Sequence, residues 1–291
     1  MKFHTRYLEV GRLKNVDFPF YIYTINCIKN EQPISAHWHE ELEILYTDCE
    51  GIIEVDEEVI HFDKGSFVFV NKEQLHMVRT YTAGNIYALV FDFGFIEFKN
   101  NDFCQNEILN KLKNKKLLFP KASEFPKGLY KEISGLLAEI ISLYYSDITG
   151  RELKIKCNLY QLIFSIYTNR KFMFSMPENE SYSAPQLSYV KDTILYMENN
   201  YAAPITIEEL AKNINVSKYY LIKVFKLITG ETPIIYLRNL RLDISKDFLS
   251  QGYSVTEAAL MSGFGSLSYY IRKFREKNTI SPKEYRSLSL N

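Results

Sequence analysis

Hydrophobic and polar positions follow two different periods along the chain. Between residues 18 and 98, apolar residues come in short runs that are rich in β-branched and aromatic side chains and often alternate with polar ones, a pattern typical of β-strands. Turn-forming residues separate these runs at intervals of roughly 8–12 residues, as in an antiparallel barrel or sandwich. The predicted strands span residues 18–26, 42–47, 51–62, 65–71 and 86–98.

Farther along the chain, apolar residues recur at intervals of three and four, as they do on one face of a helix. Residues 128–147 carry one such stripe, beginning at Leu129, and residues 152–169 carry a second, beginning at Ile155. Each stripe needs a surface that covers it. We expect the barrel wall to cover one, and a second copy of the chain to cover the other through an antiparallel helix pair rich in Leu and Ile. The alternative is that both stripes close the core of their own domain.

Residues 175–188 are polar, contain two prolines and show no periodicity, which predicts a linker. The length of 291 residues fits two domains of ordinary size. We therefore expect an α+β protein with an N-terminal antiparallel β-barrel (1–100), trailing helices used for dimerisation (101–176), a linker (177–188) and an all-α C-terminal domain (189–291).

The C-terminal domain contains one sequence unit twice. Residues 221–237 match residues 270–286 at an offset of 49, with basic, aromatic and proline positions in register. Each copy begins with the signals of a helix-turn-helix, a capped short helix followed by a turn and a second capped helix. Those signals are two capping boxes, two alanines at the helix crossings, two turn residues suited to positive φ and a cap on the second helix of the first copy: Thr206 with Glu209, Ser254 with Glu257, Ala211, Ala259, Asn215, Gly263 and Ser217.

The second helix of each copy has an inner and an outer face. Leu221 and Phe225 are predicted to point into one small core, and Tyr270 and Phe274 into another. The outward positions are Tyr219, Ile222 and Lys223, then Ser268, Tyr269 and Arg272. Because the caps and the basic positions match in both copies, the pattern favours DNA binding over a helical bundle with a solvated basic face.

Charge agrees with this division of roles. The net charge of zero hides a balance of −4 over residues 1–184 and +4 over residues 185–291, so the C-terminal half is the one suited to a polyanion. The cysteines are scattered without a metal-binding or CxxC spacing, which predicts reduced thiols: Cys27, Cys49, Cys104 and Cys157. Without a secretion signal or an apolar run of ~18 residues, we expect a cytoplasmic protein that makes no membrane contact.

Residues 190–288 resemble the DNA-binding region of the AraC/XylS family of bacterial transcription regulators. The resemblance rests on "TIEELAKNINVSKYYLIKVFKLITGETPIIYLRNLRL" and on the family signature at Gly263, Phe264, Ser268, Tyr269, Tyr270, Arg272, Phe274, Arg275, Ser281, Pro282, Tyr285 and Arg286. It implies that the six outward residues contact bases, and we expect phosphate contacts from Lys218, Lys226, Lys273 and Arg275. Two departures are Gly265-Ser266, often acidic or amide in the family, and Thr279, usually a helix-ending glycine, so Asn278 is expected to end that helix instead.

The N-terminal half resembles the effector domain usual in that family, a cupin barrel. Metal-binding cupins carry an HxHxxxE pattern and then a glycine followed eleven residues later by histidine, and this chain has His37, His39, Glu43, Gly65 and His76 in that order. On a regular strand, the first three would point to one face, into the barrel. Asn71 and Glu73 stand where the cupin turn carries proline and glycine.

Three interpretations of this motif compete: a metalloenzyme, a regulator with a bound metal, and a metal-free effector pocket, which we favour. Neutral imidazoles and a carboxylate suit Zn, Fe, Mn or Ni in the first two. In the third, they hydrogen-bond a small polar effector, and aromatic rings stack on it; the resemblance implies a sugar-like compound. The expected pocket is His37, His39, Glu43, His76, Tyr23 and Trp38, with Tyr7 and Tyr21 as further stacking surfaces and His61 outside it.

The sequence thus predicts a sequence-specific DNA-binding transcription regulator, not an enzyme, that needs no cofactor. Its expected partners are double-stranded promoter DNA, a small polar effector, a second copy of the chain and RNA polymerase. The alternative is a metal-binding cupin enzyme with a helical accessory domain.

Overall fold

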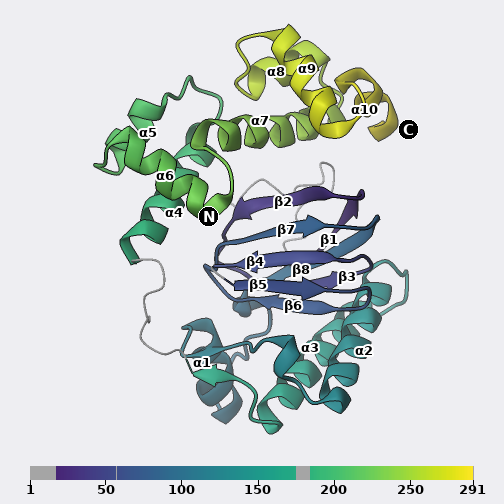
Figure 1. Cartoon of the computed structure of the whole chain (residues 1–291). Coiled ribbons are helices and arrows are strands. Elements are labelled where there is room, and N and C mark those ends of the chain that lie inside the picture. Colours follow the sequence, from purple (N-terminus) through teal and green to yellow (C-terminus); the bar gives the residue numbers. More distant parts are fainter. Residues whose placement is uncertain (1–17, 57, 175–183, 291) are drawn as a thin grey trace. The chain divides into compact units, whose positions relative to one another are not determined.

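A computed structural model describes residues 18–56, 58–174 and 184–290. These residues fall into two compact units, 18–174 and 184–290, one built on β-sheets and one on helices (Figure 1). The α+β class with two domains is therefore confirmed. Within the described ranges, no helix is long and apolar enough to span a membrane.

The barrel unit contains two four-stranded antiparallel sheets (Figure 1). The first sheet has the order β1-β8-β3-β6 and the second has the order β2-β7-β4-β5. In chain order the strands are β1 (Phe20–Cys27), β2 (Glu31–His37), β3 (Leu42–Thr47), β4 (Gly51–Val55), β5 (Glu58–Phe62), β6 (Phe67–Val70), β7 (His76–Thr80) and β8 (Gly84–Phe91).

Strand β3 shows how the two faces of the first sheet are used. Leu42 and Ile44 belong to a core cluster that also contains residues of the trailing helices. Successive side chains of a strand point to opposite faces, so Glu43 and Leu45 lie on the other face. Glu43 contacts His76 of β7, which places this second face against the second sheet. The first sheet therefore separates a helix-packed core from the barrel interior.

Both predicted helical stripes are buried in that core. Helices α2 (Lys127–Tyr144) and α3 (Arg151–Thr168) bury their Leu and Ile residues against each other and against the first sheet. The expectation that a second copy covers one of these stripes is wrong, because the sheet and the neighbouring helix already cover both. The shorter elements of this unit are η2 (Phe93–Phe95), η3 (Gln105–Leu109), α1 (Asn110–Lys113), β9 (Leu117–Leu118), η4 (Ala122–Glu124) and β10 (Met173–Phe174).

Three strand predictions need correction. The predicted strand 51–62 is a hairpin of β4 and β5, and Asp56 in its turn has a positive φ of 51°. The predicted strand 86–98 ends at Phe91 and continues as a 3-10 turn. Strands β2 and β7 were not predicted, because two register shifts in their pairing interrupt the alternation of apolar residues.

The helical unit is the predicted double helix-turn-helix. Its helices are α4 (Ala184–Asn200), α5 (Ile207–Asn213), α6 (Lys218–Thr229), α7 (Pro233–Ser250), α8 (Val255–Met261), α9 (Leu267–Asn278) and α10 (Pro282–Ser289). Both predicted capping boxes form, and Ser217 caps α6 through the backbone N–H of Tyr220. Helix α4 begins inside the stretch predicted as linker, because Pro185 lies in the first helical turn, where proline is tolerated.

The turns use the predicted left-handed residues. Asn215 has a φ of 54° and Gly263 a φ of 86°. Helix α9 ends at Asn278, as predicted, and Thr279 after it takes the left-handed conformation with a φ of 62°. The left-handed backbone conformation at residue 279 therefore forms without the glycine that usually occupies this position in the family.

Candidate nucleic-acid interface and buried histidine cluster

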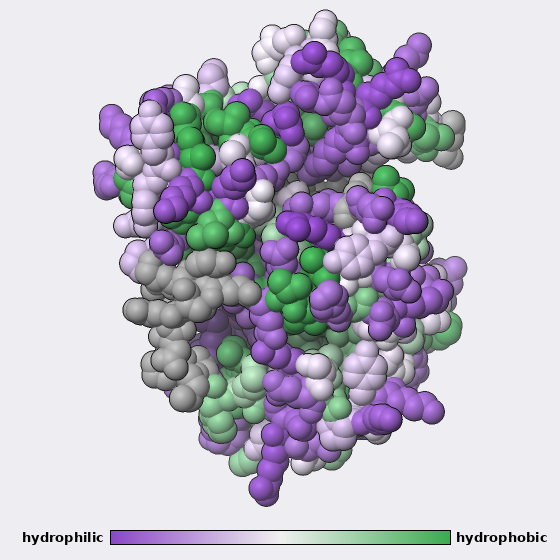
Figure 2. Space-filling model, in the orientation of Figure 1, coloured by the Kyte–Doolittle hydropathy of each residue, from purple (hydrophilic) through white to green (hydrophobic). Residues whose placement is uncertain are grey.

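The outer faces of α6 and α9 carry the residues predicted to contact bases. Tyr219 is 75% exposed, and Lys223, Ser268, Tyr269 and Arg272 are also exposed, while Ile222 is half-buried. On the side of the molecule shown in Figure 2, hydrophilic side chains cover much of the helical unit, with hydrophobic patches between them. Both second helices thus present a mixed polar and aromatic face to solvent.

The inner faces of α6 and α9 anchor them firmly. Leu221, Phe225, Tyr270 and Phe274 are fully buried, as predicted. The hydroxyl of Tyr270 donates to Ser245 Oγ of α7 at 3.1 Å, and burial raises the pKa of Tyr270 to about 12. A buried hydroxyl that is satisfied in this way fixes the rotation of α9 about its own axis.

Several of the cationic side chains are paired within the protein. Lys218 lies 2.9 Å from Glu208 Oε1, and Glu276 lies 2.5 Å from Lys273 and 3.9 Å from Arg272. The Arg272 guanidinium also lies 5.5 Å from the centre of the Tyr269 ring. Lys226 and Arg275 are exposed. The candidate phosphate contacts therefore include both partnered and exposed cations.

In the barrel, the structure brings together all four residues of the predicted motif. One ligand atom from each of His37, His39, Glu43 and His76, the His–Glu cluster, lies within 4.8 Å of the others. All four residues are buried, with at most 7% exposure. Glu43 Oε2 lies 2.8 Å from His76 Nε2 and 3.2 Å from His39 Nε2.

The route by which these side chains converge differs from the prediction. His37 is the last residue of β2 and pairs directly with His76, the first of β7, while His39 lies in the following loop and Glu43 on β3 of the other sheet. The prediction of a single regular strand through residues 37–43 is therefore wrong. The four residues of the cluster come from different elements and meet across the barrel interior. They do not share one face of a single strand.

Backbone carbonyls fix the tautomer of each histidine in the cluster. The Nδ1 atoms of His37, His39 and His76 lie 2.9, 3.1 and 3.0 Å from the carbonyl oxygens of Ser35, Glu41 and Gln74. A carbonyl only accepts, so each Nδ1 carries a proton. A ring protonated on both nitrogens also donates from Nε2, and a neutral ring presents a lone pair there. This is the arrangement in which protein histidines bind metals.

Charge inside the cluster is concentrated on Glu43. Burial alone would raise the pKa of Glu43, but the charge of His76 and hydrogen bonds from His39 and His76 outweigh it and hold the pKa below its ordinary value. Burial likewise opposes protonation of His39, yet the carboxylate of Glu43 leaves its pKa raised. Among the described residues, Glu43 Oε1 is buried without a hydrogen-bond partner. The cluster therefore favours a positive charge, either protons or a cation.

A divalent metal fits this donor set. Bonds of about 2.0–2.2 Å to imidazole nitrogen and carboxylate oxygen place two ligand atoms of one metal no more than about 4.4 Å apart. The spread of 4.8 Å in the His–Glu cluster lies just above this limit, so small side-chain shifts would bring the four donors around one ion. Three Nε2 lone pairs and the unpartnered Oε1 supply the donors.

The other residues predicted to line the pocket, Tyr21, Tyr23 and Trp38, are half-buried. Tyr23 is half-buried on β1, and its pKa is raised by burial first and then by neighbouring charges that include Glu41 and Glu43. Tyr21 stacks on Tyr23 with ring centres 6.2 Å apart. Trp38, which separates His37 from His39 in the sequence, is half-buried as well. His61 is exposed on β5, as predicted, and Tyr7 lies outside the described residues.

The two departures from the cupin turn have structural consequences. Asn71 exchanges hydrogen bonds with the backbone of Phe119, with its Oδ1 accepting at 2.8 Å and its Nδ2 donating at 3.1 Å. Glu73 adopts a positive φ of 65°, the conformation that glycine would supply. Asn71 thereby ties the barrel to the segment before α2, a role that the sequence did not predict.

Comparisons with known proteins agree with this architecture. The family model of a helix-turn-helix domain matches residues 210–287. The uncharacterized HTH-type transcriptional regulator YdeC of Bacillus subtilis (strain 168) is 25% identical over 296 residues, which cover 97% of this chain and 96% of the relative. A probable AraC family transcriptional regulator of known structure from Rhodopseudomonas palustris CGA009 is 30% identical, covering 35% of this chain and 97% of that chain, with a TM-score of 0.34.

An apo variant of ToxT from Vibrio cholerae strain SCE256 matches in fold across both units. It has a TM-score of 0.50 at 13% identity, covering 92% of this chain and 97% of that chain. Fold, repeated motif and relatives together define a DNA-binding transcription regulator. The chain belongs to the AraC/XylS family.

Proposed function

We propose that this regulator contacts the bases of double-stranded DNA with α6 and α9, the second helices of its two helix-turn-helix units. Lys223 and Arg272 donate to guanine edges, and Tyr219, Ile222, Ser268 and Tyr269 complete the two faces. Lys218, Lys226, Lys273 and Arg275 contact phosphates. The observation that supports this most strongly is the pair of buried anchors beneath two matching exposed faces on α6 and α9.

Selection of full-length protein on random duplex DNA tests this proposal. We expect a preferred asymmetric site of roughly 17–20 base pairs, because two major-groove helices about one turn apart cover that length. Affinity should fall steeply with salt, as phosphate contacts require. Equal retention of preferred and random duplexes at moderate salt would contradict the proposal. Contact with RNA polymerase stays a prediction.

We propose further that the His–Glu cluster is the sensory site and that it binds a divalent transition metal without catalysing a reaction. A bound cation would neutralise Glu43 and hold the three imidazoles in place. Deep burial of all four donors supports an ion better than a sugar-sized ligand, which needs an open cavity of several hundred Å³. Binding regulates by preferring one conformation of the protein over another.

Metal analysis of full-length protein purified without added metal tests this second proposal. We expect about one transition-metal ion per chain, lost in Glu43→Gln, which keeps the shape of the side chain but removes its charge. His61→Ala is the matched control, because His61 is exposed outside the cluster. Trp38, the sole tryptophan, lies between two candidate ligands and should report binding by fluorescence. Absence of metal, together with a neutral polyol that binds wild type but not Glu43→Gln, would support the sugar expectation instead.

The outer face of α3 supports a third proposal, that two copies of the chain form a dimer. Its residues 153, 157, 160, 164 and 167 follow spacings of four and three, the seam of a helix pair. Leu153 is 70% and Phe164 59% exposed, and Tyr167 and Cys157 are exposed as well. The interface we propose is thus aromatic and lies opposite the Leu and Ile stripe that was first expected to form it.

Sedimentation and cross-linking of full-length protein test the dimer. We expect a dimer at tens of micromolar that Phe164→Asp dissociates, whereas Phe103→Asp, exposed elsewhere in the same unit, leaves it intact. Mild oxidation should join two copies through Cys157 in a Cys104→Ser background, since the other cysteines are buried. A monomer at these concentrations would reject the proposal.

A further inference from the structure

We infer that contacts among the α4–α5 loop, α7 and the turn before α9 hold the two helix-turn-helix units at a fixed spacing. The distance between the two half-sites in DNA then becomes a determinant of specificity in its own right. This inference rests on the proposed base contacts of both units, and it concerns how those units are held rather than which bases they contact.

Arg241 of α7 forms the first part of this connection. Its Nε donates to the carbonyl oxygen of Tyr201 at 2.8 Å, and its Nη2 donates to that of Ala203 at 2.7 Å. Both carbonyls belong to the loop that enters the first helix-turn-helix. Arg241 is half-buried rather than on a solvated face, and this burial lowers the pKa of its guanidinium.

The turn of the second helix-turn-helix lies against the same loop. A Cβ added to Gly263 would come within 2.5 Å of the Tyr201 carbonyl oxygen, 3.0 Å of Ala202 Cα and 2.9 Å of Arg241 Nε. Backbone therefore meets backbone here, with the guanidinium beside the contact. A glycine required by the turn also allows the two units to touch.

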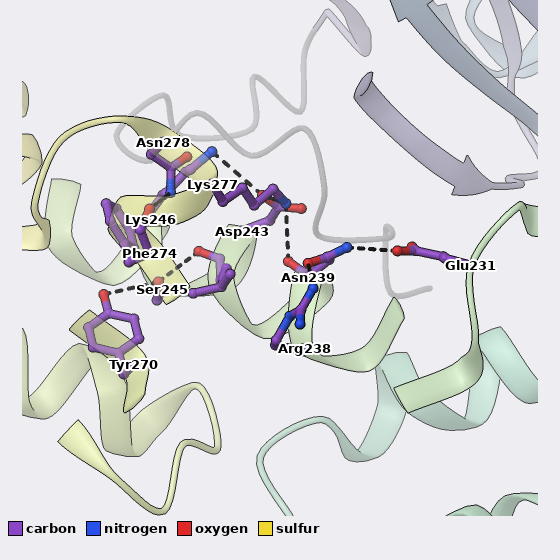
Figure 3. A network of polar contacts seen from close by, with 11 residues as sticks. Glu231, Arg238, Asn239, Asp243, Ser245, Lys246, Tyr270, Phe274, Lys277 and Asn278 are labelled. Carbon is purple, nitrogen blue, oxygen red and sulfur yellow. Dashed lines mark hydrogen bonds and ion pairs between the residues drawn. The ribbon is translucent and has the colours of Figure 1, made fainter. Parts of the chain in front are cut away.

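A polar chain across α7 makes a second connection (Figure 3). Asn239 Nδ2 donates to Glu231 Oε2 at 2.8 Å, just after the end of α6. From α9, Lys277 Nζ lies 3.4 Å from the Asn239 carbonyl oxygen and 2.7 Å from Asp243 Oδ1. The end of each second helix is thus connected to the same segment of α7.

These two connections restrict motions that a single shared helix would permit. Inserting or deleting one base pair between half-sites moves them by about 3.4 Å and rotates them by about 35°, because one turn of about 34–36 Å contains 10–10.5 base pairs. Two units held as one body cannot follow that change without losing contacts at one half-site. A pair joined only through α7 would follow it more easily.

The test uses full-length protein and duplexes derived from its selected site: the site itself, versions with one base pair inserted or deleted between half-sites, and a single half-site. We expect wild type to bind both altered spacings at least ~10-fold more weakly, comparable to the cost of a mismatched base pair. Arg241→Met keeps the apolar stem and removes both donated hydrogen bonds. In this variant the spacing penalty should fall below ~3-fold, with half-site affinity unchanged.

Lys246→Met is the matched control, because Lys246 is another cation of α7 and its ion pair with Asp243 stays within that helix. It should retain the wild-type spacing penalty. Equal weakening of Arg241→Met on all four duplexes, an unchanged penalty in that variant, or wild-type tolerance of both altered spacings would each overturn the inference. A sequence preference without any dependence on spacing would contradict this inference alone, whereas absence of sequence preference would contradict the proposed base contacts as well.

Discussion

The two helix-turn-helix units place the same demands on the backbone and meet them with different residues. Each needs a left-handed residue in its turn, supplied by Asn215 in the first unit and Gly263 in the second. Each needs another where its second helix ends, supplied by Gly230 with a φ of 78° and Thr279 with a φ of 62°. Glycine and non-glycine residues have thus exchanged positions between the two copies.

The turns also differ in length. The caps of the first helices, Thr206 and Ser254, are offset by 48 residues, whereas the caps of the second helices, Ser217 and Ser266, are offset by 49. The second turn therefore contains one additional residue. Each unit nevertheless keeps both caps, which shows that the helix ends are preserved while the connection between them is free to vary.

The exposed faces have diverged further than the backbone. Helix α6 contains no acidic residue, and Leu227 on it is 61% exposed. At the matching position of α9 stands Glu276, which pairs with Arg272 and Lys273. Two units with one backbone plan and different surfaces are suited to two different half-sites, and hence to an asymmetric DNA site.

The largest expected effect is a difference in stability between substitutions in the two helix-turn-helix turns. Gly263→Ala should destabilise the helical unit by roughly 3 kcal/mol, because a left-handed alanine costs about 1–2 kcal/mol and the added Cβ must also displace backbone. Asn215→Ala faces the left-handed cost alone, about 1 kcal/mol. Urea unfolding followed by far-UV circular dichroism measures both.

Trp38 provides the internal control for these variants, since its fluorescence reports the barrel only. Its transition should stay unchanged while the helical signal shifts. Equal destabilisation by the two substitutions would show that close packing at Gly263 contributes nothing beyond its φ.

The next effect separates base contacts from phosphate contacts. Arg272→Ala should lose about 1–3 kcal/mol of discrimination at one position of the preferred site, because its bidentate contact with a guanine would be gone. Lys226→Ala should weaken all sequences alike and reduce the salt slope by about 0.9, the value for one phosphate contact. Binding to the preferred site and to single-base variants at several salt concentrations distinguishes them, and indistinguishable profiles would refute the assignment.

The sequence could predict the helical unit almost completely because its signals are local. Caps, turn residues and the apolar stripes of α6 and α9 each depend on residues within one helical turn of one another. The barrel was predicted less well, because its pairing depends on distant segments. Bulges conceal β2 from any periodicity argument, and the meeting of His37 with His76 follows from strand pairing rather than from spacing.

A smaller effect is expected when the residue types that end α6 and α9, glycine and threonine, are exchanged. Thr279→Gly should stabilise the helical unit by about 1 kcal/mol, because a β-branched residue is strained at a φ of 62°. Gly230→Thr should destabilise it by a similar amount through the same strain at 78°. The same urea titration checks both, and a destabilised Thr279→Gly would mean that the threonine side chain stabilises this end by contacts that outweigh its strain.

The smallest expected effect concerns the acidic residue that only the second of these helices carries. Glu276→Gln should release Arg272 and Lys273 from their intrahelical partner and remove one negative charge near DNA, so affinity for all duplexes should rise a few-fold. Leu227→Glu introduces the matching charge on α6 and should weaken binding by a similar factor. Because both effects are screened by ions, each should shrink as salt is raised. Tighter binding of Glu276→Gln to the preferred site alone would instead mean that Glu276 acts through the geometry of Arg272, making it a determinant of sequence rather than of overall affinity.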